Sequence, residues 1–212
     1  LLGIVLAGGL LSGTLGEYVM HRAMHSRHAL GERHARHHRL GFGQGWLGEL
    51  IDYAWGGLPA GVALAAILTW VTGAPRLGGA FLIGVVLHLV FAAYAHQLQH
   101  ERPELVFWMR KPVHHLHHEH GLWHSNFGIS TPLWDHVFGT YEELPFEGRT
   151  ARATARLADY FAIDWGSPPK LDAQRRLQWE EQARERARVL RAARRERRQR
   201  RRGAKAPPRE VA

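Results

Sequence analysis

Histidine is the residue whose number and spacing in this chain point to chemistry. The sequence contains 16 histidines and no cysteine, which excludes disulfides, thiolate metal sites and a cysteine nucleophile. Residues i, i+3 and i+4 of a helix project from one face, so two or three imidazoles of a cluster can converge on one metal ion. Imidazole binds iron, zinc and copper, and the ligand type alone does not name the metal. Four clusters alternate between two spacings: His21-x3-His25, His34-x2-His37-His38, His96-x3-His100 and His114-x2-His117-His118.

A structured site for two metal ions explains this pattern better than the alternatives. One HxxxH pair on a solvated helix is common and would be weak support. The adjacent pairs His37-His38 and His117-His118 do not suit core packing, because buried imidazoles need polar partners. A metal-sequestering histidine tract is usually soluble and of low complexity, whereas these clusters follow apolar segments.

The spacing of the other histidines does not show clearly whether they bind metal. We expect His115 and His120, beside the fourth cluster, to orient the ligands from outside or to lie at the surface. His124 lies in residues 121–128, where a turn could return it to the site as an extra ligand or a proton carrier. The histidines that fit no cluster are expected to be structural: His28, His136 and, as a hydrogen-bonded core residue, His88.

Three apolar runs are long enough to form membrane-spanning helices. They cover residues 1–20, 54–74 and 77–94, and a helix needs ~20 apolar residues to cross the bilayer core. A signal peptide is the alternative for the first run, but this run lacks a basic start and histidines follow it at once. Two buried helices of a soluble protein are the alternative for the others, but neither run shows a polar stripe.

The order of these runs places all four clusters on one side of the membrane. The second and third runs are joined by a short turn at Pro75 and Arg76, so they form a hairpin. Residues 20–53 and the chain after residue 94 therefore share a side. The positive-inside rule predicts that this side is cytoplasmic, because most of the basic residues lie on it. Besides those of the tail, they include Arg22, Arg27, Arg33, Arg36, Arg39, Arg110 and Lys111.

Charge divides the 212-residue chain into a neutral body and a basic tail. Residues 1–180 contain 15 Lys and Arg against 15 Asp and Glu, and residues 181–212 contain 13 against four. We predict a membrane domain over residues 1–145, a cytoplasmic extension over 146–180 and a basic helical or disordered tail over 181–212. The tail is expected to be solvated, with attraction to anionic lipid headgroups as the alternative. No base-reading module accompanies it, so we expect no nucleic-acid partner.

Two further motifs follow the histidine clusters. They are Asn126-Phe127-Gly128 and the segment Trp-Asp-His-Val-Phe-Gly-Thr-Tyr at residues 134–141. This order of motifs, over residues 1–145, resembles the fatty acid hydroxylase superfamily. That group includes sterol desaturases, sterol methyl oxidases, fatty acid 2-hydroxylases and, more distantly, carotenoid hydroxylases. The family usually has four membrane helices, and three runs in a sequence that begins with leucine fit a missing upstream segment.

The resemblance implies an all-α integral membrane protein, in which a transmembrane helix bundle carries a cytoplasmic histidine-rich cap with two iron ions. It implies dioxygen as co-substrate and the hydroxylation or desaturation of a fatty acyl, sterol or related isoprenoid lipid. Zinc could replace iron in purified protein. The ligands carried over by position are His21, His25, His34, His37, His38, His96, His100, His114, His117 and His118. Extra ligands or outer partners of the ligands are expected among His115, His120, His124, Asn126 and Asp135.

Such an oxidation needs electrons from a partner. The glycine-rich stretch 41–46 is not a dinucleotide fingerprint, because Trp46 replaces the third glycine, and the sequence has no haem-attachment motif. We therefore expect a separate cytochrome, ferredoxin or flavin reductase as electron donor. Two other functions stay open. One is a zinc-dependent membrane hydrolase with Glu101 or Glu119 as base, and the other is a non-enzymatic metal-binding or transport protein, although a transport path would not leave every cluster on one side.

Overall fold

The computed structural model describes residues 1–25, 31, 34–35, 37–38, 41, 43–146, 154–166, 181, 185 and 188, and His28 lies outside them. The chain divides into two compact units, Leu1–Lys170 and Leu171–Ala212. Of the second unit, three residues are described, and Arg188 there pairs with Glu185 at 2.9 Å. The predicted domain boundaries at residues 145 and 180 stay predictions. The helices and the short elements of the fold belong to the first unit.

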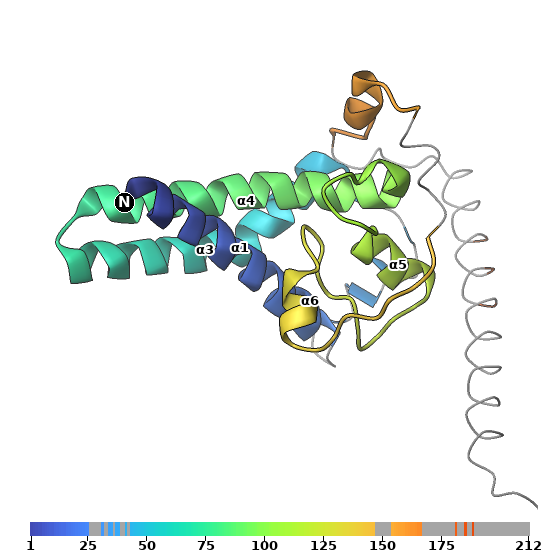
Figure 1. Ribbon diagram of the computed structural model, residues 1–212, viewed down its shortest axis with the longest axis horizontal. Helices are drawn as coiled ribbons and strands as arrows, with labels where there is room; N and C mark the ends of the chain where they lie inside the picture. The colour runs from blue at the N-terminus through green and yellow to red at the C-terminus, as the bar shows by residue number, and fades with distance from the viewer. Residues whose placement is uncertain are drawn as a thin grey trace, which may run out of the picture. The chain divides into compact units, whose positions relative to one another are not determined.

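Three long helices form the body of this unit (Figure 1). They are α1 (Leu2–Met24), α3 (Trp46–Thr72) and α4 (Pro75–Glu101). All three are long and apolar enough to cross a membrane. They extend the predicted apolar runs at the ends that carry histidines or buried carboxylates. The described residues form helices and turns without a strand, which confirms the predicted all-α membrane fold class.

The outer surface of the three helices is apolar. Trp55 and Trp70 of α3 are 80% and 84% exposed, and Ile67 between them is 55% exposed. Contiguous apolar surface of this kind favours aggregation in water. In a bilayer it contacts lipid, while the backbone polar groups are satisfied within each helix. The surface therefore fits a membrane environment.

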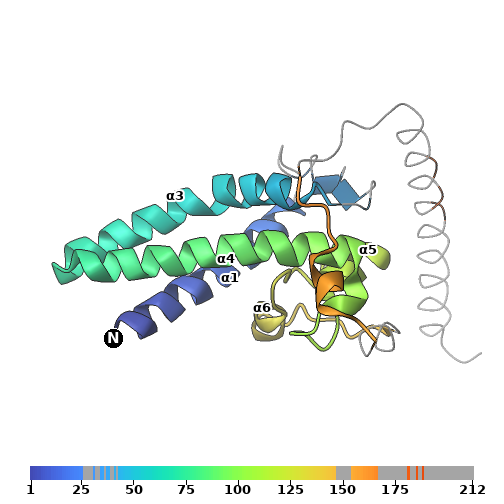
Figure 2. The same cartoon turned by 90° about the horizontal axis from the view of Figure 1, so that it is seen from above.

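α4 lies between the other two long helices and packs against both (Figure 2). Two glycines let α1 approach α4 closely. A Cβ atom at Gly84 would lie 2.1 Å from the carbonyl oxygen of Leu6, and one at Gly9 would lie 2.1 Å from that of Phe81. Small residues are the usual means of close packing between membrane helices, because lipid tails are as apolar as the side chains. This contact sets where the histidine-bearing ends of α1 and α4 lie.

Short elements form a cap at the end of the bundle where α1 and α4 end and α3 begins (Figure 1). A buried cluster joins the cap to the bundle, and it includes Leu98 of α4, Val106 and Ile163. The cap therefore holds its own histidines over those of α1 and α4. Its elements are η1 (Pro103–Leu105), α5 (Val113–Glu119), α6 (Leu133–Val137) and η2 (Leu157–Phe161).

The close contact of α1 and α4 predicts a specific sensitivity to added volume. Gly84→Ala should destabilise the protein by about 1 to 3 kcal/mol, because the new methyl group meets the backbone of α1. Gly79→Ala on the same helix is the control, since no atom lies within 4 Å of its added Cβ. Thermal unfolding of the two variants in detergent measures the difference. Equal unfolding midpoints would contradict the packing described here.

Candidate metal centre

Five histidines from three parts of the chain form the first of two imidazole groups. Nε2 of His25 lies 2.9 Å from Nε2 of His34 and 3.0 Å from Nε2 of His117. Nε2 of His21 lies 3.1 Å from that of His34. We name this set group A, and its ligand nitrogens all lie within 4.8 Å of one another. Its members are His21, His25, His34, His38 and His117.

Four histidines form a second set, group B, beside the first. Nε2 of His100 is 3.2 Å from Nε2 of His37 and 3.2 Å from Nε2 of His114. The ring centroids of His96 and His114 are 4.4 Å apart. The ligand nitrogens of this set, His37, His96, His100 and His114, again lie within 4.8 Å of one another. The two groups adjoin, because the ring centroids of His21 in group A and His114 are 5.2 Å apart.

The sequence clusters are divided between the two groups. The neighbours His37 and His38 belong to groups B and A, and on α5 His114 belongs to B whereas His117 belongs to A. Adjacent side chains on a helix point about 100° apart and those at i and i+3 about 60° apart, so one helix reaches both groups. Each of these two segments thus contributes histidines to both groups instead of completing one. Three i, i+4 pairs each stay within one group: His21 and His25, His34 and His38, and His96 and His100.

His118, the tenth predicted ligand, lies against both groups without belonging to either set. Its ring stacks on that of His38 at 4.0 Å between centroids and 14° between planes, and lies 4.5 Å from the ring of His114. Both of its ring nitrogens are buried and have no hydrogen-bond partner among the described residues. An imidazole buried in this way is costly unless a further partner is bound, which fits a metal ligand at the edge of group B.

The converging nitrogens are arranged as ligands of a cation and not as a hydrogen-bond network. A neutral imidazole carries one N–H and donates one hydrogen bond. Nε2 of His25 lies within 3.3 Å of Nε2 of His21, of His34 and of His117, and one proton cannot satisfy three contacts. Nitrogens bound at ~2.1 Å to a zinc-sized ion are about 3.0 to 3.4 Å apart, in agreement with these separations. The residues present therefore fit a first-row transition metal.

Two backbone carbonyl groups orient imidazoles of group A. Nδ1 of His21 lies 2.6 Å from the carbonyl oxygen of Phe127, and Nδ1 of His117 lies 2.8 Å from that of Ser125. A carbonyl oxygen can only accept, so Nδ1 carries the proton in both rings. The Nε2 lone pair is then free and points into the group, which is the usual arrangement around a metal-binding histidine.

Glu49 orients an imidazole of group B in the same manner. Its Oε2 lies 2.7 Å from Nδ1 of His96, and both side chains are almost fully buried. Its Oε1 accepts a hydrogen bond from the backbone N–H of Gln44 at 2.8 Å. α3 holds none of the grouped histidines and joins the site through this carboxylate. Our reading of the sequence missed Glu49, although an acidic residue just before an apolar run was the available signal.

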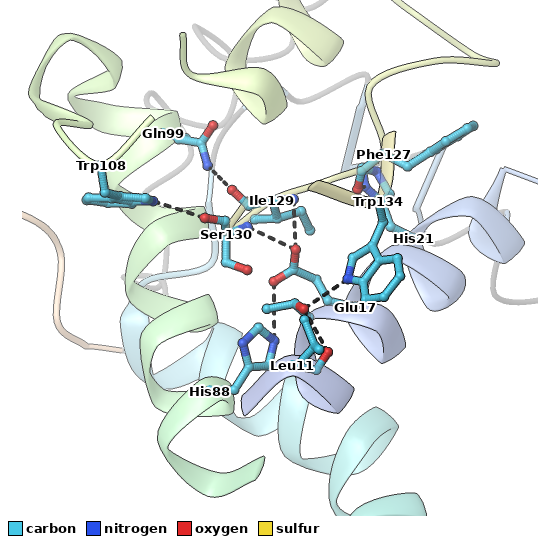
Figure 3. A network of polar contacts seen from close by, with 11 residues as sticks. Leu11, Glu17, His21, His88, Gln99, Trp108, Phe127, Ile129, Ser130 and Trp134 are labelled. Carbon is cyan, nitrogen blue, oxygen red and sulfur yellow. Dashed lines mark hydrogen bonds and ion pairs between the residues drawn. The ribbon is translucent and has the colours of Figure 1, made fainter. Parts of the chain in front are cut away.

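A buried polar network ties the carbonyl-bearing loop to two membrane helices (Figure 3). Oε1 of Glu17 accepts hydrogen bonds from the N–H groups of Ile129 and Ser130 at 2.8 and 2.9 Å. Oε2 of Glu17 lies 3.4 Å from Nε2 of His88, and both side chains are buried. Gln99 donates to the carbonyl oxygen of Ile129 at 2.7 Å. Ionisable groups inside a span are costly and usually functional, so the interruption of an apolar run by Glu17 was a signal that sequence reasoning did not use.

Asp135 and Asn126, predicted as extra ligands or outer partners, fix the same loop from its other side. Asp135 accepts hydrogen bonds from the N–H groups of Phe127 and Gly128 at 2.8 and 2.7 Å. Asn126 has a positive φ of 59°, and its side chain exchanges two hydrogen bonds with the backbone of Glu142. Neither residue belongs to group A or group B. Their contacts hold the loop that orients the imidazoles of His21 and His117.

The three remaining predicted candidates also lie outside both groups. Nε2 of His115 is 3.2 Å from the carboxylate of Glu119, one turn further along α5. His120 lies 4.0 Å from the same carboxylate, and His124 is exposed. His115 and His120 thus contact Glu119 in the outer part of the cap.

Burial keeps six imidazoles of the candidate centre neutral. Burial, together with the neighbouring ring of His21, lowers the pKa of His25 to about 3. Neutral rings leave a lone pair for a metal ion, which binds the deprotonated form of its ligands. Burial and the neighbouring imidazoles also hold the pKa below its ordinary value in His34, His38, His114, His117 and His118.

Comparison with known proteins relates this chain to one family. Residues 6–140 match the family model described as fatty acid hydroxylase. The chain is 28% identical over 156 residues to a dihydroceramide fatty acyl 2-hydroxylase of Arabidopsis thaliana, covering 66% of the chain and 61% of that relative. It is 35% identical over 77 residues to a second dihydroceramide fatty acyl 2-hydroxylase of that plant, covering 36% of the chain and 31% of the relative. The chain thus spans less than two thirds of these relatives, and no solved structure matches it.

The grouping predicts how metal content responds to single changes on α5. Purified protein loaded with ferrous iron should hold about two ions per chain, and His117→Ala should lower this to about one, because group A loses a ligand. His115→Ala is the matched control, since its ring contacts Glu119 and belongs to neither group. Elemental analysis measures the ratio. An equal loss in both variants, or under one ion per chain in the parent, would contradict the assignment.

Proposed function

Because the chain belongs to the fatty acid hydroxylase family, as its motifs predicted, we propose that it is a dioxygen-dependent di-iron enzyme that oxidises a membrane lipid. The observation that carries this proposal is the pair of adjoining imidazole groups at the end of three apolar helices. Iron is proposed from the donor set, which suits it, and from the oxidation that the family name describes.

Groups A and B would each hold one ion, with His118 as a further ligand beside group B. Two iron ions, when bound, would supply the reduction of dioxygen and the removal of hydrogen from an unactivated carbon, which protein side chains cannot do. The chain itself orients the ligands through the carbonyl groups of Ser125 and Phe127 and the carboxylate of Glu49. It also keeps water from most of the imidazoles by burying them under the cap.

The substrate we propose is a lipid with a fatty acyl chain, and the product is its hydroxylated form. The names of the two plant relatives describe fatty acyl 2-hydroxylases, which favours hydroxylation over desaturation and an acyl chain over a sterol or isoprenoid. The apolar outer surface of the helices supports entry of such a lipid from the bilayer. The electrons would come from a separate cytochrome, ferredoxin or flavin reductase.

The structure offers little to the two alternative functions. A zinc hydrolase needs a carboxylate base beside its water, but the two candidates are engaged elsewhere. Glu101 accepts hydrogen bonds from Gln97 and from the backbone of Asp164, and Glu119 contacts His115. A transport protein would place ligands along its spans, whereas both groups lie at one end of the bundle.

Activity is tested by lipid oxidation with labelled dioxygen. Iron-loaded protein in vesicles with a ceramide, a reductase system and 18O2 should yield a lipid that is heavier by one labelled oxygen atom. His100→Ala should abolish this product, because group B loses a central ligand. His136→Ala is the control, since this exposed ring stacks on Tyr141 away from both groups. Mass spectrometry that finds no labelled lipid with any acyl substrate, or loss of activity in the control alone, would contradict the proposal.

We also propose that the cap faces the cytoplasm, because Arg22, Arg110 and Lys111 lie at the cap end and Arg76 lies at the opposite turn. The chain has no cysteine, so single cysteines report on topology without background. In intact cells an impermeant maleimide should modify Arg76→Cys and leave Arg110→Cys unmodified. Lysis should expose Arg110→Cys to the reagent. The reverse pattern in intact cells would refute this orientation.

A further inference from the structure

Within the described part of the cap, large apolar side chains are exposed at two places. Both lie beside the membrane helices, and elsewhere the described cap exposes no large hydrophobic side chain. The exposure is high, reaching 77% for Leu157 and 58% for both Val137 and Phe161. We name these places the α6 edge, formed by Leu133, Val137 and Phe138, and the η2 edge, formed by Phe107, Leu157, Phe161 and Trp165.

The α6 edge lies alongside α1, below the level of its histidines. The indole N–H of Trp134 donates to Oγ1 of Thr14 at 2.9 Å. The ring of Phe138 stacks on that of Tyr18 at 5.2 Å between centroids. Thr14 precedes His21 by seven residues, which is roughly 10 Å along a helix. This edge therefore reaches about two turns down the apolar surface of α1.

The η2 edge lies alongside α3 and α4. The ring of Trp165 stacks on that of Tyr94 at 6.2 Å between centroids and lies 5.6 Å from the ring of Trp46. Next to Phe107 in sequence, Trp108 places its ring 5.1 Å from that of Phe91. The contacted rings belong to the turns that immediately precede the histidines of α4 and to the first turn of α3. Tryptophan and tyrosine gather in this way at the interface between membrane and water.

The lengths of the helices place both edges at the boundary of the hydrocarbon core. α3 and α4 contain 27 residues each, or about 40 Å, whereas the hydrocarbon core is ~30 Å thick. The excess of about 10 Å belongs to the end that carries the histidines and buried carboxylates, because at the opposite end α3 and α4 carry a single charged residue, Arg76 beside the turn. The boundary then falls about two turns below the histidine-bearing end of α4, which is the level of the Phe91 and Tyr94 rings.

We propose that the cap is seated in the headgroup layer of the bilayer through the α6 edge and the η2 edge. The occupant of these surfaces is the membrane that surrounds the chain's own helices, because each edge continues the apolar surface of α1 or of α3 and α4. The two edges lie alongside different helices, so lipid contacts the cap at two separate places. This seating goes beyond the proposed reaction and does not depend on it.

Depth-dependent fluorescence quenching tests the seating. The full chain carries a single NBD-labelled cysteine, at Val137→Cys for the α6 edge or Phe161→Cys for the η2 edge, in phosphatidylcholine vesicles. Arg110→Cys, an exposed position of the cap outside both edges, is the control with the same label. Lipids that bear a nitroxide near the headgroup should remove most of the fluorescence at both edges and little of it at the control. Aqueous iodide should quench in the opposite order.

Two results would overturn the proposal. Labels at both edges that iodide quenches as strongly as at Arg110→Cys would place them in water. Labels protected from both quenchers would show that protein, such as a second copy of the chain, covers the edges. Leu133→Cys and Leu157→Cys repeat the measurement at neighbouring exposed positions if a first variant does not elute as folded protein.

Discussion

The loop of residues 125–130 must present two carbonyl oxygens to two imidazoles, and the rest of the site depends on this constraint. Those imidazoles, His21 and His117, come from different helices, yet their Nε2 atoms serve the same group. A neutral imidazole can turn either nitrogen toward a metal, so the acceptor on the outer nitrogen decides which lone pair points inward. If the loop moved, both rings would lose their tautomer and their direction together.

This loop is held by ionisable side chains that lie inside the membrane body. Glu17 belongs to a span and bonds to the loop backbone, while its second oxygen lies near His88 of the neighbouring span. Burying these groups is costly, and their hydrogen bonds and mutual pairing offset that cost. The glycine contact between α1 and α4 determines how far apart Glu17 and His88 lie. Helix packing in lipid is therefore coupled to ligand geometry at the end of the bundle.

The depth of groups A and B along the helices bears on which part of a lipid could reach them. The groups lie where the apolar helix surfaces give way to buried histidines, carboxylates and a polar cap. A carbon close to the polar linkage of a lipid lies at that same depth, whereas the end of an acyl chain lies near the bilayer centre. A site built at the helix ends thus suits oxidation close to a headgroup, in keeping with the proposed hydroxylation. It also leaves the outer face of the cap available to an electron donor.

The sequence by itself determined the element types and indicated which histidines could act as donors, because apolar length and histidine spacing are local properties. The runs at residues 1–20, 54–74 and 77–94 predicted the three long helices, although each helix continues further at its polar end. Only the tertiary structure decided that His37 and His38 serve different groups, since this depends on how helices from distant parts of the chain pack. Spacing also could not reveal that Glu49 orients His96, which requires α3 to lie beside α4. The carbonyl groups of Ser125 and Phe127 were equally hidden, because every residue has a carbonyl and only the fold directs these two toward imidazoles.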